Sequence, residues 1–223
     1  LGFLMDSYTQ SGHHTIVFDL SQVRASGEII RGFGGTASGP GPLALSLSRI
    51  TEILNNIKRE HLNPLEAMSV DHAIAQCVIA GNIRRSARMS ILHWNDPHIF
   101  EFINCKADHA DHWTTNISVE VDEAFFEALD NSDSHALEVF NKVTEAMLAN
   151  GEPGLYNSFK ASEGERGGDV RATNPCGEIA LFAEKAAGES CNLGHVNLSA
   201  YGTDHSGALE AFSLMARVLV RAT

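Results

Sequence analysis

An amide, a thiol and a carboxylate occur at alternate positions of one short segment, as Asn174, Cys176 and Glu178. In an extended segment, side chains two positions apart point to the same side, so one face would carry a hydrogen-bond donor, a sulfur and a proton acceptor. Pro175 and Gly177 fill the positions between them. Proline presets a backbone angle and glycine allows close approach of a ligand. The pattern predicts a rigid loop tip that presents a thiol for nucleophilic or one-electron sulfur chemistry.

Three further cysteines complete the set of thiols in the chain. Cys191 follows the first segment, within residues 189–198, and is a second candidate for redox chemistry. Cys77 lies in a helical pattern and is expected to be a packing thiol. Cys105 has the spacing to His109 and His112 that zinc sites use, but structural zinc takes about four ligands and a fourth is not obvious. A zinc-binding module is therefore an alternative that rests on these residues alone, and no metal is predicted.

The amino-acid composition limits the classes of partner that the chain is expected to bind. Its 223 residues include 28 acidic and 16 basic side chains, which gives a formal net charge of −12. That balance argues against a nonspecific nucleic-acid surface or an anionic membrane surface. No apolar run approaches the ~20 residues of a membrane helix, and no signal segment is recognisable. Four cysteines are too few for a secreted disulfide scaffold of this size, so we expect an intracellular, cytoplasmic protein.

The elements that must position these residues follow from apolar periodicity. We expect strands at 15–20, 89–92 and 113–121, and either strands or tight extended segments at 180–182 and 195–198. We expect helices at 43–59, 69–79, 96–103, 122–129, 135–148 and 207–223, with Ser69 as the N-cap of the second and Pro97 in the first turn of the third. Residues 25–42 and 164–169 are expected to be loops. Strands that alternate with helices predict an α/β architecture with parallel strands.

Five segments, in this order along the chain, resemble ribonucleotide reductases. They are GFGGTASGP at 32–40, AGNIRRSARM at 80–89, NISV at 116–119, GEPG at 151–154 and ATNPCGEI at 172–179. The proline before Cys176 and the glycine after it are most similar to the adenosylcobalamin-dependent (class II) branch. The resemblance implies a ten-stranded α/β barrel with a central catalytic finger loop. Residues 1–223 would be part of that barrel domain, whose N- and C-terminal parts lie outside this chain.

The resemblance implies a role for each residue of the thiol segment. Cys176 would be the thiyl-radical cysteine that takes the 3′ hydrogen of the substrate ribose. Glu178 would accept the 3′-OH proton as general base, and Asn174 would hold a ribose hydroxyl. Cys191 would belong to the dithiol pair that reduces the 2′ carbon. The second redox cysteine of the family lies upstream of the first effector loop, where this chain has none.

Two further sites are implied by the resemblance. An effector site for a deoxynucleoside triphosphate would use Asp19, Arg24, Arg31, Gly34 and Gly35. A loop that passes effector identity to the base pocket would use Arg84, Arg85, Ser86 and Arg88. Arginine suits phosphate because its planar fork donates paired, charge-assisted hydrogen bonds. The plain alternatives are a glycine-rich surface turn for the first site and a solvated basic turn for the second.

The function that the resemblance implies is reduction of ribonucleoside di- or triphosphates to 2′-deoxyribonucleotides for DNA synthesis. Adenosylcobalamin would be the cofactor and a thioredoxin-like protein the reductant, with neither a nucleic acid nor a membrane as partner. The oligomeric state stays open, a homodimer included. One alternative is a class I large subunit that uses a separate radical-generating subunit. The other is a non-catalytic fragment that retains only nucleotide-effector binding, which the missing upstream cysteine favours.

Overall fold

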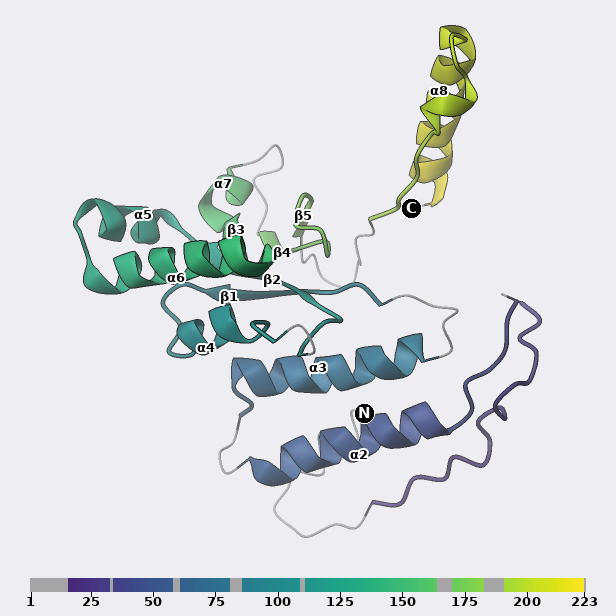
Figure 1. Ribbon diagram of the computed structural model, residues 1–223, viewed down its shortest axis with the longest axis horizontal. Coiled ribbons are helices and arrows are strands. Elements are labelled where there is room, and N and C mark those ends of the chain that lie inside the picture. The colour runs from purple at the N-terminus through teal and green to yellow at the C-terminus, as the bar shows by residue number, and fades with distance from the viewer. Residues whose placement is uncertain are drawn as a thin grey trace.

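A three-stranded parallel sheet lies at the centre of the molecule (Figure 1). This computed structural model describes residues 16–32, 34–57, 61–80, 86–108, 111–163, 170–182 and 191–222. The sheet has the order β1 (Met89–His93), β2 (Asn116–Val121) and β3 (Gly154–Asn157). Met89 pairs with Asn116 and Ser118 pairs with Gly154, both in parallel register. The predicted α/β architecture with parallel strands is therefore confirmed.

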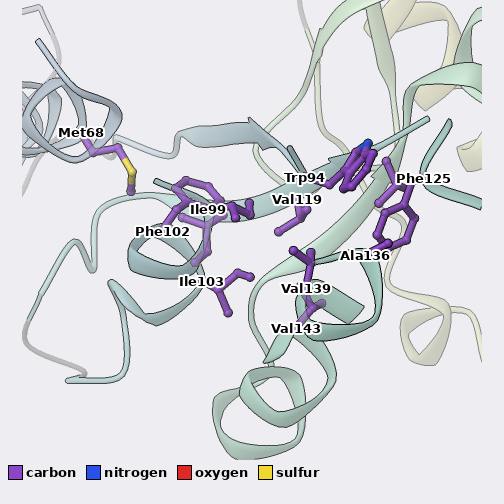
Figure 2. Close-up of a cluster of buried hydrophobic side chains, with 12 residues drawn as sticks. Met68, Trp94, Ile99, Phe102, Ile103, Val119, Phe125, Ala136, Val139 and Val143 are labelled. Carbon is purple, nitrogen blue, oxygen red and sulfur yellow. The ribbon is translucent and has the colours of Figure 1, made fainter. Parts of the chain in front are cut away.

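Alternation along β2 gives this strand an apolar side and a polar side. Ile117, Val119 and Val121 are at most 1% exposed and point to the helices α4 (Ile99–Asn104), α5 (Glu123–Asp130) and α6 (Ser134–Asn150). Figure 2 shows Val119 between side chains of α4 and α6. Each such buried side chain stabilises the fold by about 1.5–3 kcal/mol. Asn116, Ser118 and Glu120 alternate with these residues and face the other side of the sheet.

Two helices form a separate layer below the sheet in Figure 1. They are α2 (Gly41–Asn56) and α3 (Pro64–Ile79), which bury Ile50, Leu54 and Val70 between them. The prediction of Ser69 as N-cap of the second helix is wrong, because the Ser69 hydroxyl donates to the Leu65 carbonyl inside α3. Asn63 is the N-cap, and its reciprocal capping box with Glu66 starts the helix earlier than periodicity indicated.

The rest of the chain forms a hairpin and a distant helix. β3 is followed by α7 (Ser158–Ser162), and then β4 (Val170–Thr173) pairs antiparallel with β5 (Ala180–Phe182). After η1 (Leu198–Ala200), α8 (His205–Ala222) stands away from the sheet in Figure 1. None of the helices in the described part of the chain is long and apolar enough to cross a bilayer.

Two of the predicted extended segments are not strands. Residues 16–20 belong to no strand, and Val17 there is 85% exposed. That run has high β-propensity but pairs with no strand among the described residues, and propensity alone does not make a sheet. Residues 195–197 are likewise not strand, and η1 begins at Leu198. The predicted loop at 164–169 lies outside the described residues.

Candidate active site

Cys176 lies at the tip of the turn that joins β4 to β5. The Gly177 N–H donates to the Asn174 carbonyl at 2.9 Å, which closes a four-residue turn with proline second and glycine fourth. Gly177 has φ +82°, a conformation that other residues rarely adopt. The proline and the glycine therefore shape the turn, and the Cys176 side chain is exposed at its third position.

The segment is a turn and not an extended strand, so its side chains do not share one face. Asn174 is 1% exposed, whereas Cys176 and Glu178 are both exposed. The alternation argument for one common face is therefore wrong at this segment. The turn separates a buried amide at its base from a thiol at its tip, and the Glu178 carboxylate follows the tip on the way to β5.

The buried amide of Asn174 joins three parts of the site. Its Oδ1 accepts a hydrogen bond from the Ile179 N–H at 3.0 Å, across the base of the turn. Its Nδ2 donates to the Cys191 Sγ at 3.3 Å. Cys191, 17 positions further along the chain, is thereby held at the base of the turn that carries Cys176. Cys176 and Cys191, the predicted radical cysteine and one predicted redox cysteine, are both free thiols of this one region.

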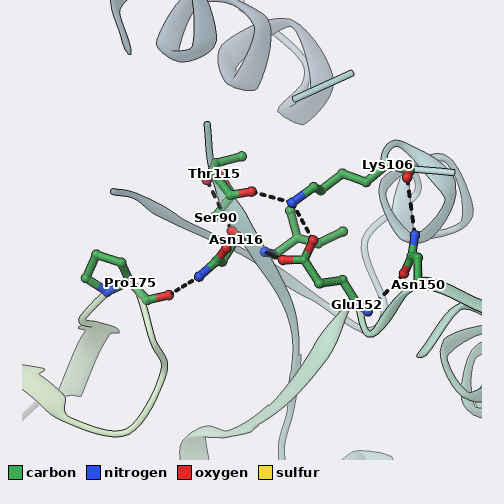
Figure 3. Close-up of polar contacts among 8 residues, drawn as sticks. Ser90, Lys106, Thr115, Asn116, Asn150, Glu152 and Pro175 are labelled. Atoms are coloured by element: carbon green, nitrogen blue, oxygen red, sulfur yellow. Dashed lines mark hydrogen bonds and ion pairs between the residues drawn. The ribbon is translucent and has the colours of Figure 1, made fainter. Parts of the chain in front are cut away.

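The turn rests on the amino-terminal end of the sheet. The Asn116 Nδ2 donates to the Pro175 carbonyl at 2.6 Å (Figure 3). A Cβ placed on Gly177 would lie 3.5 Å from the terminal methyl of Met89. Met89 and Asn116 are register partners at the starts of β1 and β2, on the face opposite Ile117. The face of the sheet that carries the polar side chains of β2 is thus the one that meets the cysteine turn.

A half-buried polar network supports that end of the sheet. Glu152 and Lys106 form an ion pair, with side chains 24% and 13% exposed. Glu152 also accepts from the Ile117 N–H at 3.2 Å, and Lys106 donates to the Thr115 carbonyl at 2.7 Å (Figure 3). No role was predicted for the Asn116 or Glu152 side chain. The available signal was their presence in the NISV and GEPG segments.

Three of the predicted effector residues, Arg31, Gly34 and Gly35, lie on one exposed loop. Its two arms meet at an isolated bridge between Ile29 and Thr36. Gly34 and Gly35 turn the loop with φ of +76° and +75°, and Arg31 is exposed beside them. The structure brings these residues onto a single loop, as the glycine-rich pattern indicated.

The other two predicted effector residues already have partners within this loop region. The Arg24 guanidinium lies 3.9 Å from the Glu28 carboxylate. Asp19 accepts from the Ser21 N–H at 2.9 Å, and hydrogen bonds from Ser21 lower the pKa of Asp19. The loop is thus held partly by its own polar contacts, and a bound phosphate would compete with Glu28 for Arg24.

The predicted specificity loop is described only at its end. Arg84 and Arg85 lie outside the described residues. Arg88 donates to the Ser86 hydroxyl at 3.0 Å and to the Asp71 carbonyl at 2.6 Å, and it pairs with the Asp71 carboxylate. Its side chain is 21% exposed, so a solvated turn does not describe Arg88. This residue anchors the loop to α3.

The remaining cysteines lie away from the turn. Cys105 packs against the core, and burial raises its pKa to about 11. Cys77 lies in α3 and borders a cavity of about 380 Å³ between α2 and α3. Across the part of the chain that the structure describes, no cluster of metal-ligating side chains is found. His109, of the alternative zinc set, lies outside that part.

The fold and the site together define an α/β protein that presents a cysteine on a hairpin tip against a parallel sheet. The family model described as ribonucleotide reductase, barrel domain, matches residues 41–138 and 130–223. The model described as B12-dependent ribonucleotide reductase, insertion domain, matches residues 2–54. The chain therefore belongs to the ribonucleotide reductase family and matches its B12-dependent branch.

Individual relatives agree with this assignment. The chain is 45% identical over 233 residues to a putative adenosylcobalamin-dependent ribonucleoside-triphosphate reductase of Mycobacterium phage D29, covering 95% of this chain and 33% of that protein. It is 35% identical over 227 residues to the adenosylcobalamin-dependent ribonucleoside-triphosphate reductase of Lacticaseibacillus paracasei, covering 96% and 28%. A crystal structure of a B12-dependent (class II) ribonucleotide reductase matches with TM-score 0.59 and 35% identity, covering 74% of this chain and 22% of that one. The chain thus spans at most 33% of the length of these relatives.

Proposed function

We propose that this chain forms part of a reductase that converts ribonucleoside triphosphates to 2′-deoxyribonucleotides by a thiyl-radical mechanism, for DNA synthesis. The observation that carries the proposal is the exposed Cys176 thiol on a proline–glycine turn whose base holds Cys191 through Asn174. The triphosphate form of the substrate follows from the names of the relatives. A class I large subunit and a fragment that only binds effector are not favoured, because the matches are to B12-dependent reductases.

Each residue of the site has its own step in the proposed reaction. A radical on the Cys176 sulfur takes the hydrogen atom from C3′, which re-forms the S–H bond and leaves a carbon radical on the sugar. The exposed Glu178 carboxylate accepts the 3′-OH proton as general base. The 2′-OH then leaves as water, with a proton from the dithiol pair. Cys191 and a partner cysteine outside this chain supply two electrons and the second proton, which give C2′ its new hydrogen, and become a disulfide. The hydrogen held on Cys176 returns to C3′, and Glu178 returns its proton to the 3′ oxygen.

The Cys176 thiol is the group of this site on which adenosylcobalamin would act. That side chain is exposed, and among the described residues a Cβ at Gly177 would meet only Met89 within 4 Å, so these residues leave the tip open to a large group. When bound, the cofactor supplies the one-electron oxidation of the thiol. The turn fixes the thiol in place, and the buried, uncharged Asn174 keeps Cys191 beside the turn without adding a charge.

The wider assignments belong to the same proposal. The described sheet is part of a ten-stranded barrel in which the Cys176 turn is the central finger loop. The loop with Arg24 and Arg31 takes a deoxynucleoside triphosphate effector, and Ser86 and Arg88 end the loop that relays its identity. A thioredoxin-like protein regenerates the dithiol, and the enzyme works in the cytoplasm.

The test is Cys176→Ser in the whole reductase, assayed with ribonucleoside triphosphate, adenosylcobalamin and a dithiol. An O–H bond is too strong to exchange hydrogen readily with a ribose carbon, so we expect no deoxynucleotide and unchanged effector binding. Cys77→Ser is the matched control, because it makes the same replacement in α3, and it should leave turnover intact. Substantial turnover by Cys176→Ser would contradict the proposal.

A further inference from the structure

We propose that Asn116 is a positioning residue for the Cys176 thiol, acting through the carbonyl of Pro175. The inference rests on the proposed function of Cys176 and adds a residue that lies 59 positions from Pro175 in the sequence. Asn116 touches neither the sulfur nor the site of hydrogen transfer. Its side-chain amide sets the orientation of the peptide unit from which Cys176 extends.

The contact itself has one chemical interpretation. A carbonyl oxygen only accepts hydrogen bonds, so the Asn116 group that faces Pro175 must be the amide nitrogen. The distance of 2.6 Å between the two atoms indicates a close contact. The Pro175 carbonyl belongs to the planar peptide unit that ends at the Cys176 Cα. Rotation of that plane would swing the thiol, and the hydrogen bond from Asn116 opposes such rotation.

Asn116 is itself held on both sides. Its N–H donates to the Arg88 carbonyl at 2.9 Å, and its carbonyl accepts from the Thr115 hydroxyl at 3.1 Å. The preceding carbonyl, that of Thr115, accepts from Lys106, and the following N–H, that of Ile117, donates to Glu152. Since Lys106 and Glu152 are paired and half-buried, they fix the backbone from which the Asn116 amide projects.

The hydrogen bonds within the hairpin do not supply this constraint. The bond from Gly177 to Asn174 and the two bonds between Asn174 and Ile179 hold the turn closed. They leave the closed turn free to tilt as a unit relative to the sheet. Asn116 ties the tip to β2 by a hydrogen bond, whereas the Met89 methyl offers no hydrogen-bonding group and lies 3.5 Å from where a Cβ on Gly177 would stand. Asn116 is exposed, so its amide matters for the orientation of the turn and adds little buried surface.

The test uses the whole reductase and begins with Asn116→Asp. This change keeps the shape of the side chain but replaces the donor with an oxygen that faces another oxygen. We expect kcat to fall by about tenfold or more, with KM within about twofold, because hydrogen transfer depends on where the thiol sits. Asn116→Gln keeps an amide donor and should recover part of the loss. Asn95→Asp, at an exposed turn beyond the other end of β1, is the matched control and should keep full activity.

A second measurement needs neither cofactor nor substrate. Amide hydrogen exchange of the peptide that contains Gly177 should speed up by about tenfold in Asn116→Asp, while peptides from α6 stay unchanged. Unchanged kcat in Asn116→Asp would overturn the proposal, and so would a loss of kcat with unchanged exchange at the turn. Cys176→Ser is run in parallel. If that variant turns over, the proposed function fails; if it is inactive while Asn116→Asp is normal, only the role of Asn116 fails.

Discussion

At the residue scale, Asn174 shows why an uncharged amide stands at the base of the turn. The side chain is buried, and it must accept from the Ile179 N–H and donate to the Cys191 sulfur at the same time. Of the small polar side chains, only asparagine offers both groups in that geometry. An aspartate there would lose the donor and place a charge in a buried position, which is costly without a partner. Any contact of Asn174 with a ribose hydroxyl remains a prediction.

The cysteines differ in their surroundings, and alkylation of the protein should reveal the difference. Burial raises the pKa of Cys105 to about 11, so at pH 8 only about one part in a thousand is thiolate. The exposed Cys176 should therefore react with iodoacetamide well before Cys105. Labelling of Cys105 should accelerate by about tenfold per pH unit as the pH rises from about 8 to about 10.

Mass spectrometry of the cysteine peptides measures both rates. The denatured protein is the control, because unfolding removes the burial of Cys105 and should let it react like the other thiols. Rapid labelling of Cys105 in the folded protein at pH 8 would contradict the packing described here.

At the scale of elements, Asp122 joins β1, β2 and α5. It is the N-cap of α5, accepting from the Phe125 N–H at 2.9 Å, and it also accepts from the Trp94 indole at 3.0 Å and from His93 at 3.1 Å. Burial acts to raise the pKa of Asp122, but the hydrogen bonds from His93, Phe125 and Trp94 together outweigh it, so the pKa is lowered from 3.8. The carboxylate therefore stabilises the fold fully above pH 3.8, and this contribution is lost as the pH falls through the lowered value.

Two substitutions of Asp122 distinguish its role as the N-cap of α5 from the role of its negative charge. Asp122→Ala removes an N-cap and leaves the Trp94 indole without its acceptor, which should destabilise the fold by about 1–3 kcal/mol. Asp122→Asn retains a good N-cap and should lose less stability than the parent protein as the pH falls from about 4 to about 2. Thermal unfolding midpoints across that range measure the difference. An equal acid sensitivity in Asp122→Asn and the parent would contradict the role of the charge.

Apolar periodicity in the sequence predicted those helices and strands whose formation depends mainly on neighbouring residues. The apolar periodicity at 43–59 and 135–148 corresponds to α2 and α6, and the run at 89–92 to β1. β3 was missed because Gly154–Asn157 is short and lacks a β-branched run, and pairing with β2 makes it a strand. The tip position of Cys176 follows from the proline and glycine beside it. The contact of Asn116 with Pro175 could not be predicted, because it depends on how the hairpin docks against the sheet.

At the scale of the whole molecule, α8 exposes apolar side chains that a stable soluble protein would cover. Leu209 is 68% exposed, Val218 52% and Val220 76%. Residues 1–223 produced alone should therefore associate or aggregate, and should lack reductase activity because a second redox cysteine is missing. Size-exclusion chromatography and an assay with adenosylcobalamin, ribonucleotides and dithiothreitol test this. A monomer with a cooperative melt and deoxynucleotide product would contradict both expectations.

The central claim is that Cys176 takes the 3′ hydrogen and Cys191 acts afterwards. Exchange of hydrogen at C3′, followed with ribonucleoside triphosphate labelled at that carbon, tests it directly in the whole reductase. The parent enzyme should exchange label and form deoxynucleotide over many turnovers. Cys191→Ser should still exchange label or decompose substrate without repeated turnover, and Cys176→Ser should do neither. Label exchange in Cys176→Ser, or normal turnover in Cys191→Ser with a dithiol, would contradict the assignment.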